Sequence, residues 1–161
     1  GVHMDMLLSV YPKYVKSMMS GEKLVEFRKH FQPTEPVKRI FVYATFPVKK
    51  ICGWFMPEDV RTMPLEQLWE ETQGISCMDR KSFDAYFMGC ETGTGIFFRG
   101  YVPVPPLDLE ELGLYPTQTC TRLTPEQSAL ADVLFVRAAK GPRPDWDKIF
   151  RTPKRVQARR R

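Results

Sequence analysis

The stretch Gly21-Glu22-Lys23-Leu24-Val25-Glu26-Phe27-Arg28 sets the charged residues Lys23, Glu26 and Arg28 among apolar ones. In an extended strand, Glu26 and Arg28 lie on one face and Lys23 lies on the other. A turn or bulge near Gly21 would bring Lys23 beside the other two charges. Two cations and a carboxylate grouped in this way favour an anionic or polar ligand. The same charges also suit a solvated edge strand, where they only prevent aggregation.

The segments around this stretch predict a domain of mixed helices and strands. Pro12 suits the first turn of a helix that runs to about Ser20, and Gly21 suits its end. Period-two patterns and β-branched residues predict strands, whereas apolar residues three and four apart predict helices. The expected strands are 6–10, 23–31, 37–44, 48–55 and 96–102. The expected further helices are 63–73 (capped by Thr62), 79–88 and 124–139, with a short helical turn at 107–114.

The pattern Gly-x-Lys-x-x-Glu-x-Arg, from Gly21 to Arg28, resembles the signature of ASCH domains, which belong to the PUA-like superfamily of small β-barrels. Segments 7–14 and 40–53 resemble the first half of the same family. The resemblance covers residues 6 to 104, with a weaker similarity through about 125. It implies an α+β fold, a small barrel of about five to six strands with flanking helices. We therefore expect one domain at 4–140, with its core at 6–104 and a C-terminal helical extension. A basic, poorly ordered tail at 141–161 should follow, anchored by Trp146 or Phe150.

The resemblance also implies nucleic-acid binding, with RNA favoured over DNA, in a cleft near the motif. Aromatic faces stack on bases, contributing about 1–3 kcal/mol per base, while polar groups read base edges. The Lys49 and Lys50 side chains alternate, so only one of them should face the cleft. Charge removal at Lys23 or Arg28 should weaken binding with little loss of stability, as is usual for exposed side chains. The candidate contact residues are Ser9, Tyr11, Lys13, Lys23, Glu26, Arg28, Thr45, Phe46, Lys49 and Lys50.

An enzymatic function is the alternative, with Lys23 and Glu26 as the catalytic residues. Some ASCH proteins are amidohydrolases that act on N4-acetylcytidine and use a motif lysine and a threonine three residues later. Lys23 matches the lysine, but Glu26 stands in place of the threonine. A neighbouring carboxylate should raise the pKa of Lys23 and so favour the ammonium, the wrong state for a general base. Ribonuclease activity also fits the family, because a Lys/Arg cluster stabilises a phosphorane. A third alternative is a protein-interaction module, with region 105–161 as the partner surface.

The net charge of +5 comes from one end of the chain. Seven of the 24 basic residues lie from Lys148 onward, where no acidic residue occurs, and the other 17 stand against 19 acidic residues. The rest of the chain therefore carries a net charge of −2. Such a basic segment binds phosphates in a salt-sensitive, sequence-independent way. The alternative is a segment that only aids solubility. Its expected phosphate contacts are Arg151, Lys154 and Arg155.

The cysteines and histidines argue against metal chemistry. Four widely spaced cysteines form no Cys-x-x-Cys pair, and the chain contains only two histidines. We therefore expect no metal or other cofactor, and reduced thiols in a cytoplasmic protein. The scarcity of histidine also argues against a Ser-His-Asp triad. No apolar run approaches the ~18 residues that span a bilayer, so no membrane association is expected.

Overall fold

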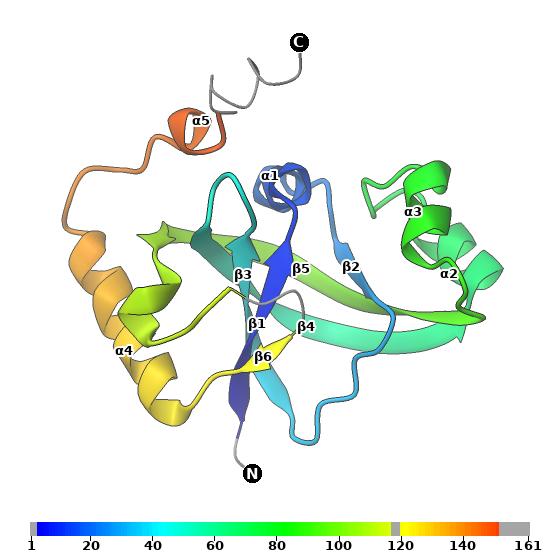
Figure 1. Cartoon of the computed structure of the whole chain (residues 1–161), viewed down its shortest axis with the longest axis horizontal. Coiled ribbons are helices and arrows are strands. Elements are labelled where there is room, and N and C mark those ends of the chain that lie inside the picture. Colours follow the sequence, from blue (N-terminus) through cyan, green and yellow to red (C-terminus); the bar gives the residue numbers. More distant parts are fainter. Residues whose placement is uncertain (1–2, 117–119, 152–161) are drawn as a thin grey trace.

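A six-stranded mixed sheet forms the centre of the protein (Figure 1). The structure is a computed structural model that describes residues 3–116 and 120–151. The strands are β1 (Met4–Val10), β2 (Val25–Arg28), β3 (Val37–Ala44), β4 (Lys50–Pro64), β5 (Thr92–Leu107) and β6 (Thr121–Arg122). Their order across the sheet is β2-β5-β4-β3-β1-β6, in which only β1 and β3 are parallel. The expected α+β fold of about six strands with flanking helices is confirmed.

The helices cover both faces and one end of this sheet. They are α1 (Pro12–Ser20), α2 (Leu65–Thr72), α3 (Arg80–Tyr86), the 3-10 helix η1 (Leu109–Leu112), α4 (Pro125–Ala138) and α5 (Trp146–Ile149). One core cluster joins α1 to one face of the sheet, and a second joins η1 and α4 to the other face. A third cluster packs α2 and α3 against β2. In Figure 1, α4 therefore flanks the molecule on the side opposite α2 and α3.

The first helix has the boundaries that its sequence predicts. Pro12 occupies the first turn, and Gly21 ends the helix with φ at 85°, a left-handed conformation that glycine adopts at low cost. Tyr14, Val15 and Met18 are buried along one side. Burial of this apolar stripe attaches α1 to the sheet, since a nine-residue helix is marginal in isolation.

The two longest strands extend well beyond the segments predicted for them. β4 runs to Pro64. Thr62 was predicted to cap a helix, but it lies in β4 and forms a hydrogen bond with Thr94 of β5, with 2.7 Å between the hydroxyl oxygens. β5 continues through Pro103, Pro105 and Pro106, which were expected to end it. β2 pairs with β5 up to Phe97, and the Phe98 N–H donates to the Leu24 oxygen; beyond that residue β5 has no strand partner on this side among the described residues. A free edge tolerates proline, because the missing N–H has no ladder bond to make.

Smaller differences concern segment ends and one strand that sequence reasoning missed. The motif strand is confined to Val25–Arg28, shorter than the predicted 23–31. The two middle helices are also slightly shorter than predicted. β6 has only two residues, too few to form a recognisable pattern, and is held by pairing with Met6 and Leu7 of β1.

The sheet is open within the described residues, with β2 and β6 at its edges. A side chain bridges the opening: Arg28 Nη2 of β2 donates a hydrogen bond to the Ser9 backbone oxygen of β1, at 2.7 Å. Ser9 lies two residues past the end of the β1–β6 pairing. The barrel-like curvature is therefore completed here by the motif arginine rather than by a further strand pair.

The described C-terminal segment is anchored by apolar side chains. Three apolar side chains pack, partly buried, against the core cluster on the α1 face: Trp146, Ile149 and Phe150. Trp146 and Phe150 are the two anchors expected from the sequence. The rest of the expected basic tail, residues 152–161, lies outside the described residues. The domain limits expected from the sequence, 4–140 for the domain and 141–161 for the tail, stay a prediction. No helix in the described ranges is long and apolar enough to cross a membrane.

Candidate functional site

The three charged residues of the motif converge, and we call Lys23, Glu26 and Arg28 the motif cluster. Lys23 Nζ lies 3.9 Å from Glu26 Oε1, and Arg28 Nη2 lies 3.8 Å from Glu26 Oε2. Lys23 precedes β2 and its backbone N–H donates to Ser17 of α1, at 3.0 Å. The turn after α1 thus breaks the strand alternation and aims Lys23 at Glu26.

Lys23 is fully buried, which the sequence did not predict. Its ammonium donates to the Ser76 backbone oxygen at 2.6 Å and lies 4.8 Å and 5.6 Å from the ring centroids of Tyr14 and Phe27. Burial lowers the pKa of Lys23, and the nearby Glu26 carboxylate offsets only part of this effect. Glu26 raises the pKa of Lys23 as expected, but desolvation outweighs the ion pair, so the pKa of this lysine is lowered overall.

Arg28 is partly accessible and retains one unused donor. Its side chain is 15% exposed, and its Nη2 already donates to the Ser9 carbonyl. Its Nε is buried and has no hydrogen-bond partner among the described residues. Glu26 Oε1 accepts a hydrogen bond from the Phe27 N–H, which fixes the carboxylate between the two cations. The cluster is therefore a buried, largely satisfied network, in which Arg28 Nε is the one buried side-chain atom without a partner in the described residues.

A second group of predicted residues forms an exposed surface where β1 and β3 end. Because these strands are parallel, their carboxyl ends meet: the Thr45 N–H donates to the Val10 oxygen at 3.0 Å. Tyr11 and Phe46, the residues that follow, are 68% and 60% exposed. We call Tyr11, Lys13, Phe46 and Lys49 the aromatic surface.

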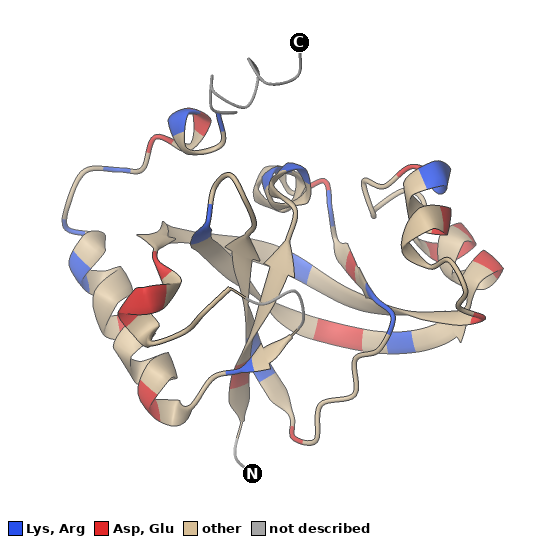
Figure 2. Ribbon diagram, viewed as in Figure 1, with Lys and Arg blue, Asp and Glu red and all other residues tan. Residues whose placement is uncertain are grey.

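A lysine accompanies one of the two aromatic residues of this surface. Lys49 Nζ lies 5.5 Å from the centroid of the Phe46 ring. Lys49 has φ at 55°, and its side chain leaves the strand direction that Lys50 follows. Figure 2 shows basic residues on α1 and where the β3–β4 connection enters β4, at one end of the sheet. Exposed rings beside ammonium groups can stack on planar ligands and attract phosphate.

Tyr14 connects the aromatic surface to the motif cluster. Its ring centroid lies 6.5 Å from that of Tyr11, 5.1 Å from Lys13 Nζ and 4.8 Å from Lys23 Nζ. Burial raises the pKa of Tyr14, so its hydroxyl stays protonated. Sequence reasoning assigned Tyr14 only to the helix core. Its position three residues after Tyr11, one helical turn away, was the available signal.

The remaining predicted residues lie elsewhere or serve the backbone. Lys50 forms an ion pair with Asp108, which precedes η1, so Lys49 and Lys50 do point to different sides. The Ser9 side chain is buried, and Thr45 makes turn hydrogen bonds with Val48 and Lys49 through its carbonyl. Arg151 is exposed and ends the described segment. Lys154 and Arg155 lie outside the described residues.

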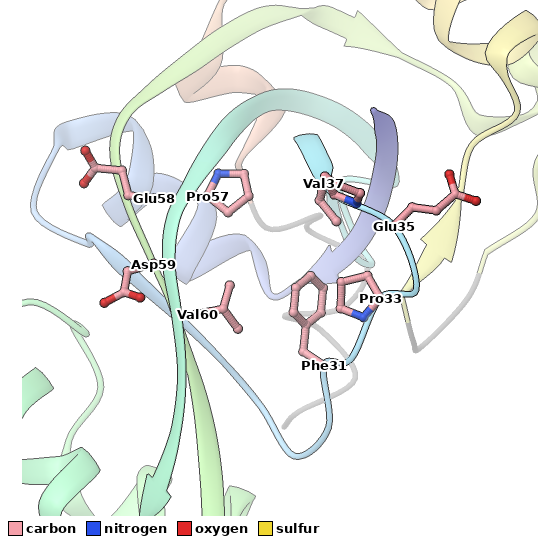
Figure 3. Close-up of a pocket in the computed structure, with 9 residues that line it drawn as sticks. Phe31, Pro33, Glu35, Val37, Pro57, Glu58, Asp59 and Val60 are labelled. Carbon is pink, nitrogen blue, oxygen red and sulfur yellow. The ribbon is translucent and has the colours of Figure 1, made fainter. Parts of the chain in front are cut away.

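A separate pocket of about 210 Å³ lies between β4 and the loop before β3 (Figure 3). Phe31, Pro33, Val37, Pro57 and Val60 provide apolar walls. Three carboxylates also line it, and each is already paired with an arginine: Glu35 with Arg122, Glu58 with Arg99, and Asp59 with Arg61. None of the predicted contact residues lines this pocket, and its carboxylates would repel phosphate.

The described residues contain no group of three His, Cys, Asp or Glu side chains placed to bind a metal ion. The four cysteines are free thiols. Burial raises the pKa of the Cys52 thiol to about 12, which keeps it protonated and unreactive.

Comparison with known proteins finds similar sequences, although no protein-family model matches the chain. It is 29% identical over 129 residues to a Zymomonas mobilis protein named ASCH domain-containing ribonuclease, covering 77% of this chain and 87% of that protein. It is also 30% identical over 110 residues to the large ribosomal subunit protein uL22 of Ureaplasma parvum. That match covers 67% of this chain but only 35% of the ribosomal protein.

Solved structures agree with the sequence match. The crystal structure of ASCH from Zymomonas mobilis superimposes with a TM-score of 0.75 at 28% identity, covering 81% of this chain and 95% of that one. A mutant of the same protein gives a TM-score of 0.76 at 27% identity, covering 81% and 98% of the two chains. With the Gly-x-Lys-x-x-Glu-x-Arg signature and the α+β fold both in place, these matches support an ASCH-domain protein.

Proposed function

We propose that this protein binds single-stranded RNA, with bases stacked on the aromatic surface. The observation that carries the proposal is the pair of exposed rings, Tyr11 at 68% and Phe46 at 60%, held at adjoining strand ends beside lysines. Exposed apolar side chains that gather at one place on a surface mark interaction sites, whereas single ones scattered over it do not. Unpaired bases expose the faces that such rings recognise, whereas bases in a duplex do not.

The charges near these rings support the same ligand. Lys13 and Lys49 are exposed lysines of this surface, with Lys49 beside the Phe46 ring, and the Arg28 side chain is 15% exposed at the sheet opening. The Zymomonas mobilis relative is named a ribonuclease, which supports RNA over DNA for this chain. The four free thiols support a reducing compartment, which we propose to be the cytoplasm.

In this proposal the motif cluster positions the surface rather than touching RNA with every member. Lys23 is inaccessible, but it joins the turn after α1 to Glu26 and to the Tyr14 ring. Arg28 joins β2 to β1, directly before Tyr11. Together these contacts determine how α1 and the end of β1 present Tyr11 and Lys13.

Replacing either exposed ring should weaken RNA binding. Tyr11→Ala and Phe46→Ala each remove one stacking face, and we expect each to weaken affinity by about 5- to 150-fold, equivalent to about 1–3 kcal/mol. Fluorescence anisotropy with a labelled, unstructured RNA oligonucleotide measures this directly, with DNA of the same sequence as comparator. Folding should be unaffected, because both side chains are exposed.

Tyr115→Ala is the matched control, since Tyr115 is 85% exposed and lies outside the aromatic surface. We expect this variant to bind like the wild type. Equal affinity of wild type, Tyr11→Ala and Phe46→Ala would refute the stacking role. Equal losses for all three variants would point to nonspecific surface effects instead.

RNA cleavage is the second candidate, favoured by the name of the Zymomonas mobilis relative. End-labelled RNA should then be cut by the purified protein, and a Lys13→Ala/Lys49→Ala variant should cut more slowly at limiting RNA concentration. If the RNA stays uncut when the protein is fully bound to it, the protein binds RNA without cleaving it.

The amidohydrolase alternative gains no comparable support. A carboxylate, Glu26, occupies the position expected for a hydroxyl, 3.9 Å from Lys23 Nζ. We expect no acetate release from N4-acetylcytidine at ~1 s⁻¹ or faster, the range typical of enzymes. Chromatography of the nucleoside after incubation with the protein is the measurement. Turnover at such a rate would instead assign the enzymatic role to this cluster.

A further inference from the structure

Helix α4 presents an apolar stripe to solvent. Leu130, Val133 and Val136 are 42%, 51% and 63% exposed, and they follow one another at helical spacing. A hollow of about 400 Å³ lies along the same stripe and is lined by Asp132, Val133, Val136, Arg137 and Lys140. A helix packed on only one side normally exposes polar residues on the other, so this stripe indicates a partner.

The orientation of α4 is set by contacts on its opposite side. Ala131 is fully buried, and the Phe135 ring packs edge-on against Phe41 of β3 at 5.8 Å between centroids. Asp132 pairs with Arg39 of β3, with 2.8 Å between Oδ1 and Nη1. The apolar stripe therefore cannot turn inward. In Figure 1, α4 lies on the outer flank, away from α2 and α3.

The stripe is self-complementary about Val133. Glu126 lies seven residues before Val133, in the first turn of α4, and Lys140 lies seven residues after it, two residues past the end of the helix. Both side chains are exposed, and neither forms an ion pair within residues 3–116 and 120–151. Leu130 and Val136 are likewise each three residues from Val133.

We propose that two copies of this protein associate through α4, with the helices antiparallel and a two-fold axis passing at Val133. Leu130 then packs against Val136 of the second copy, and Glu126 meets Lys140 of the second copy. Both contacts occur twice, as an isologous interface requires. A parallel pairing would set Glu126 against Glu126 and Lys140 against Lys140, and like charges disfavour it.

The dimer should be weak and should leave the aromatic surface free. A single pair of 14-residue helices buries less than the ~1,200 Å² of a standard stable interface, so dissociation in the micromolar range or weaker is expected. The aromatic surface lies at the ends of β1 and β3, on elements other than α4. Dimerisation would therefore present two RNA-binding surfaces together, although the interface itself does not depend on the proposed function.

Sedimentation velocity of the full chain over a wide concentration series tests the interface. The wild type should shift from 18.7 kDa toward twice that mass as concentration rises. Val133→Glu should stay monomeric at every concentration. Glu126→Lys and Lys140→Glu should each weaken the dimer by about tenfold, because each places like charges together at two symmetric positions. The double variant Glu126→Lys/Lys140→Glu should regain wild-type association.

Circular dichroism provides the folding control, and unchanged thermal unfolding of Val133→Glu is expected for an exposed position. A wild type that stays monomeric throughout would overturn the proposal. Dimerisation that Val133→Glu does not reduce, or that the double charge exchange does not restore, would also overturn it. A variant truncated after Arg151 provides a further test. If this variant dimerises and the full chain does not, residues 152–161 rather than a second copy cover the stripe in the full chain.

Discussion

Changing Lys23 to alanine should lower the free energy of unfolding by about 3–5 kcal/mol. Lys23 is fully buried, and its ammonium donates to the Ser76 carbonyl at 2.6 Å and faces Glu26 at 3.9 Å. Its removal leaves the Ser76 oxygen without this donor and the Glu26 carboxylate with only Arg28. It also leaves a cavity beside the Tyr14 and Phe27 rings. The sequence-based expectation of little stability loss at this position is therefore revised.

Urea unfolding followed by circular dichroism measures this loss. Lys13→Ala is the matched control, because Lys13 is an exposed lysine beside the same Tyr14 ring, and its change should stay within ~0.5 kcal/mol. The double variant Lys23→Met/Glu26→Gln should recover part of the stability, since it removes both charges and keeps most of the volume. If Lys23→Ala unfolds at the same urea concentration as Lys13→Ala, Lys23 does not hold the fold together.

The second large effect is expected at Gly53 of β4. A β-carbon added there would lie 2.3 Å from Tyr101 Cζ and 2.5 Å from the Val102 backbone oxygen. The Tyr101 ring packs on the glycine, and its hydroxyl is buried without a hydrogen-bond partner in the described residues. The clash between the added β-carbon and the Val102 oxygen can be relieved only if β4 and β5 move apart. The strand register holds both backbones in place there, because it pairs Gly53 with Pro103 and Trp54 with Val102. Gly53→Ala should therefore cost at least about 3 kcal/mol.

Gly74→Ala serves as the control, because no atom lies within 4 Å of the added β-carbon. The free energy of unfolding of Gly74→Ala should change by less than ~1 kcal/mol. A small increase is expected, because alanine lowers the conformational entropy of the unfolded chain. Tyr101→Leu combined with Gly53→Ala should not restore stability, since the Val102 oxygen remains in the way. Full recovery in that double variant would show that the ring alone sets the requirement for glycine.

The sequence by itself determined the local elements and the grouping of the motif. Pro12 and Gly21 delimit α1 through backbone preferences that act within one turn. Val37–Ala44 forms a strand with the predicted limits, because its β-branched and aromatic residues suit a buried strand. The turn at Gly21 brings Lys23 to Glu26, and Lys49 and Lys50 point to different sides, both as predicted, although the positive φ of Lys49 rather than strand alternation separates the two lysines.

Only the tertiary structure decided which of these groups is accessible. The burial of Lys23 depends on Ser76, which is 53 residues away in sequence, meeting the nearby Tyr14 and Phe27 rings around the ammonium. The sign of the pKa shift of Lys23 depends on the same burial. The length of β5 likewise depends on where β2 stops pairing with it, because proline is tolerated only on a free edge. Local propensity acts over a few residues. Burial and pairing arise from segments far apart in sequence, so desolvation at Lys23 and the open edge of β5 appear only once the sheet has formed.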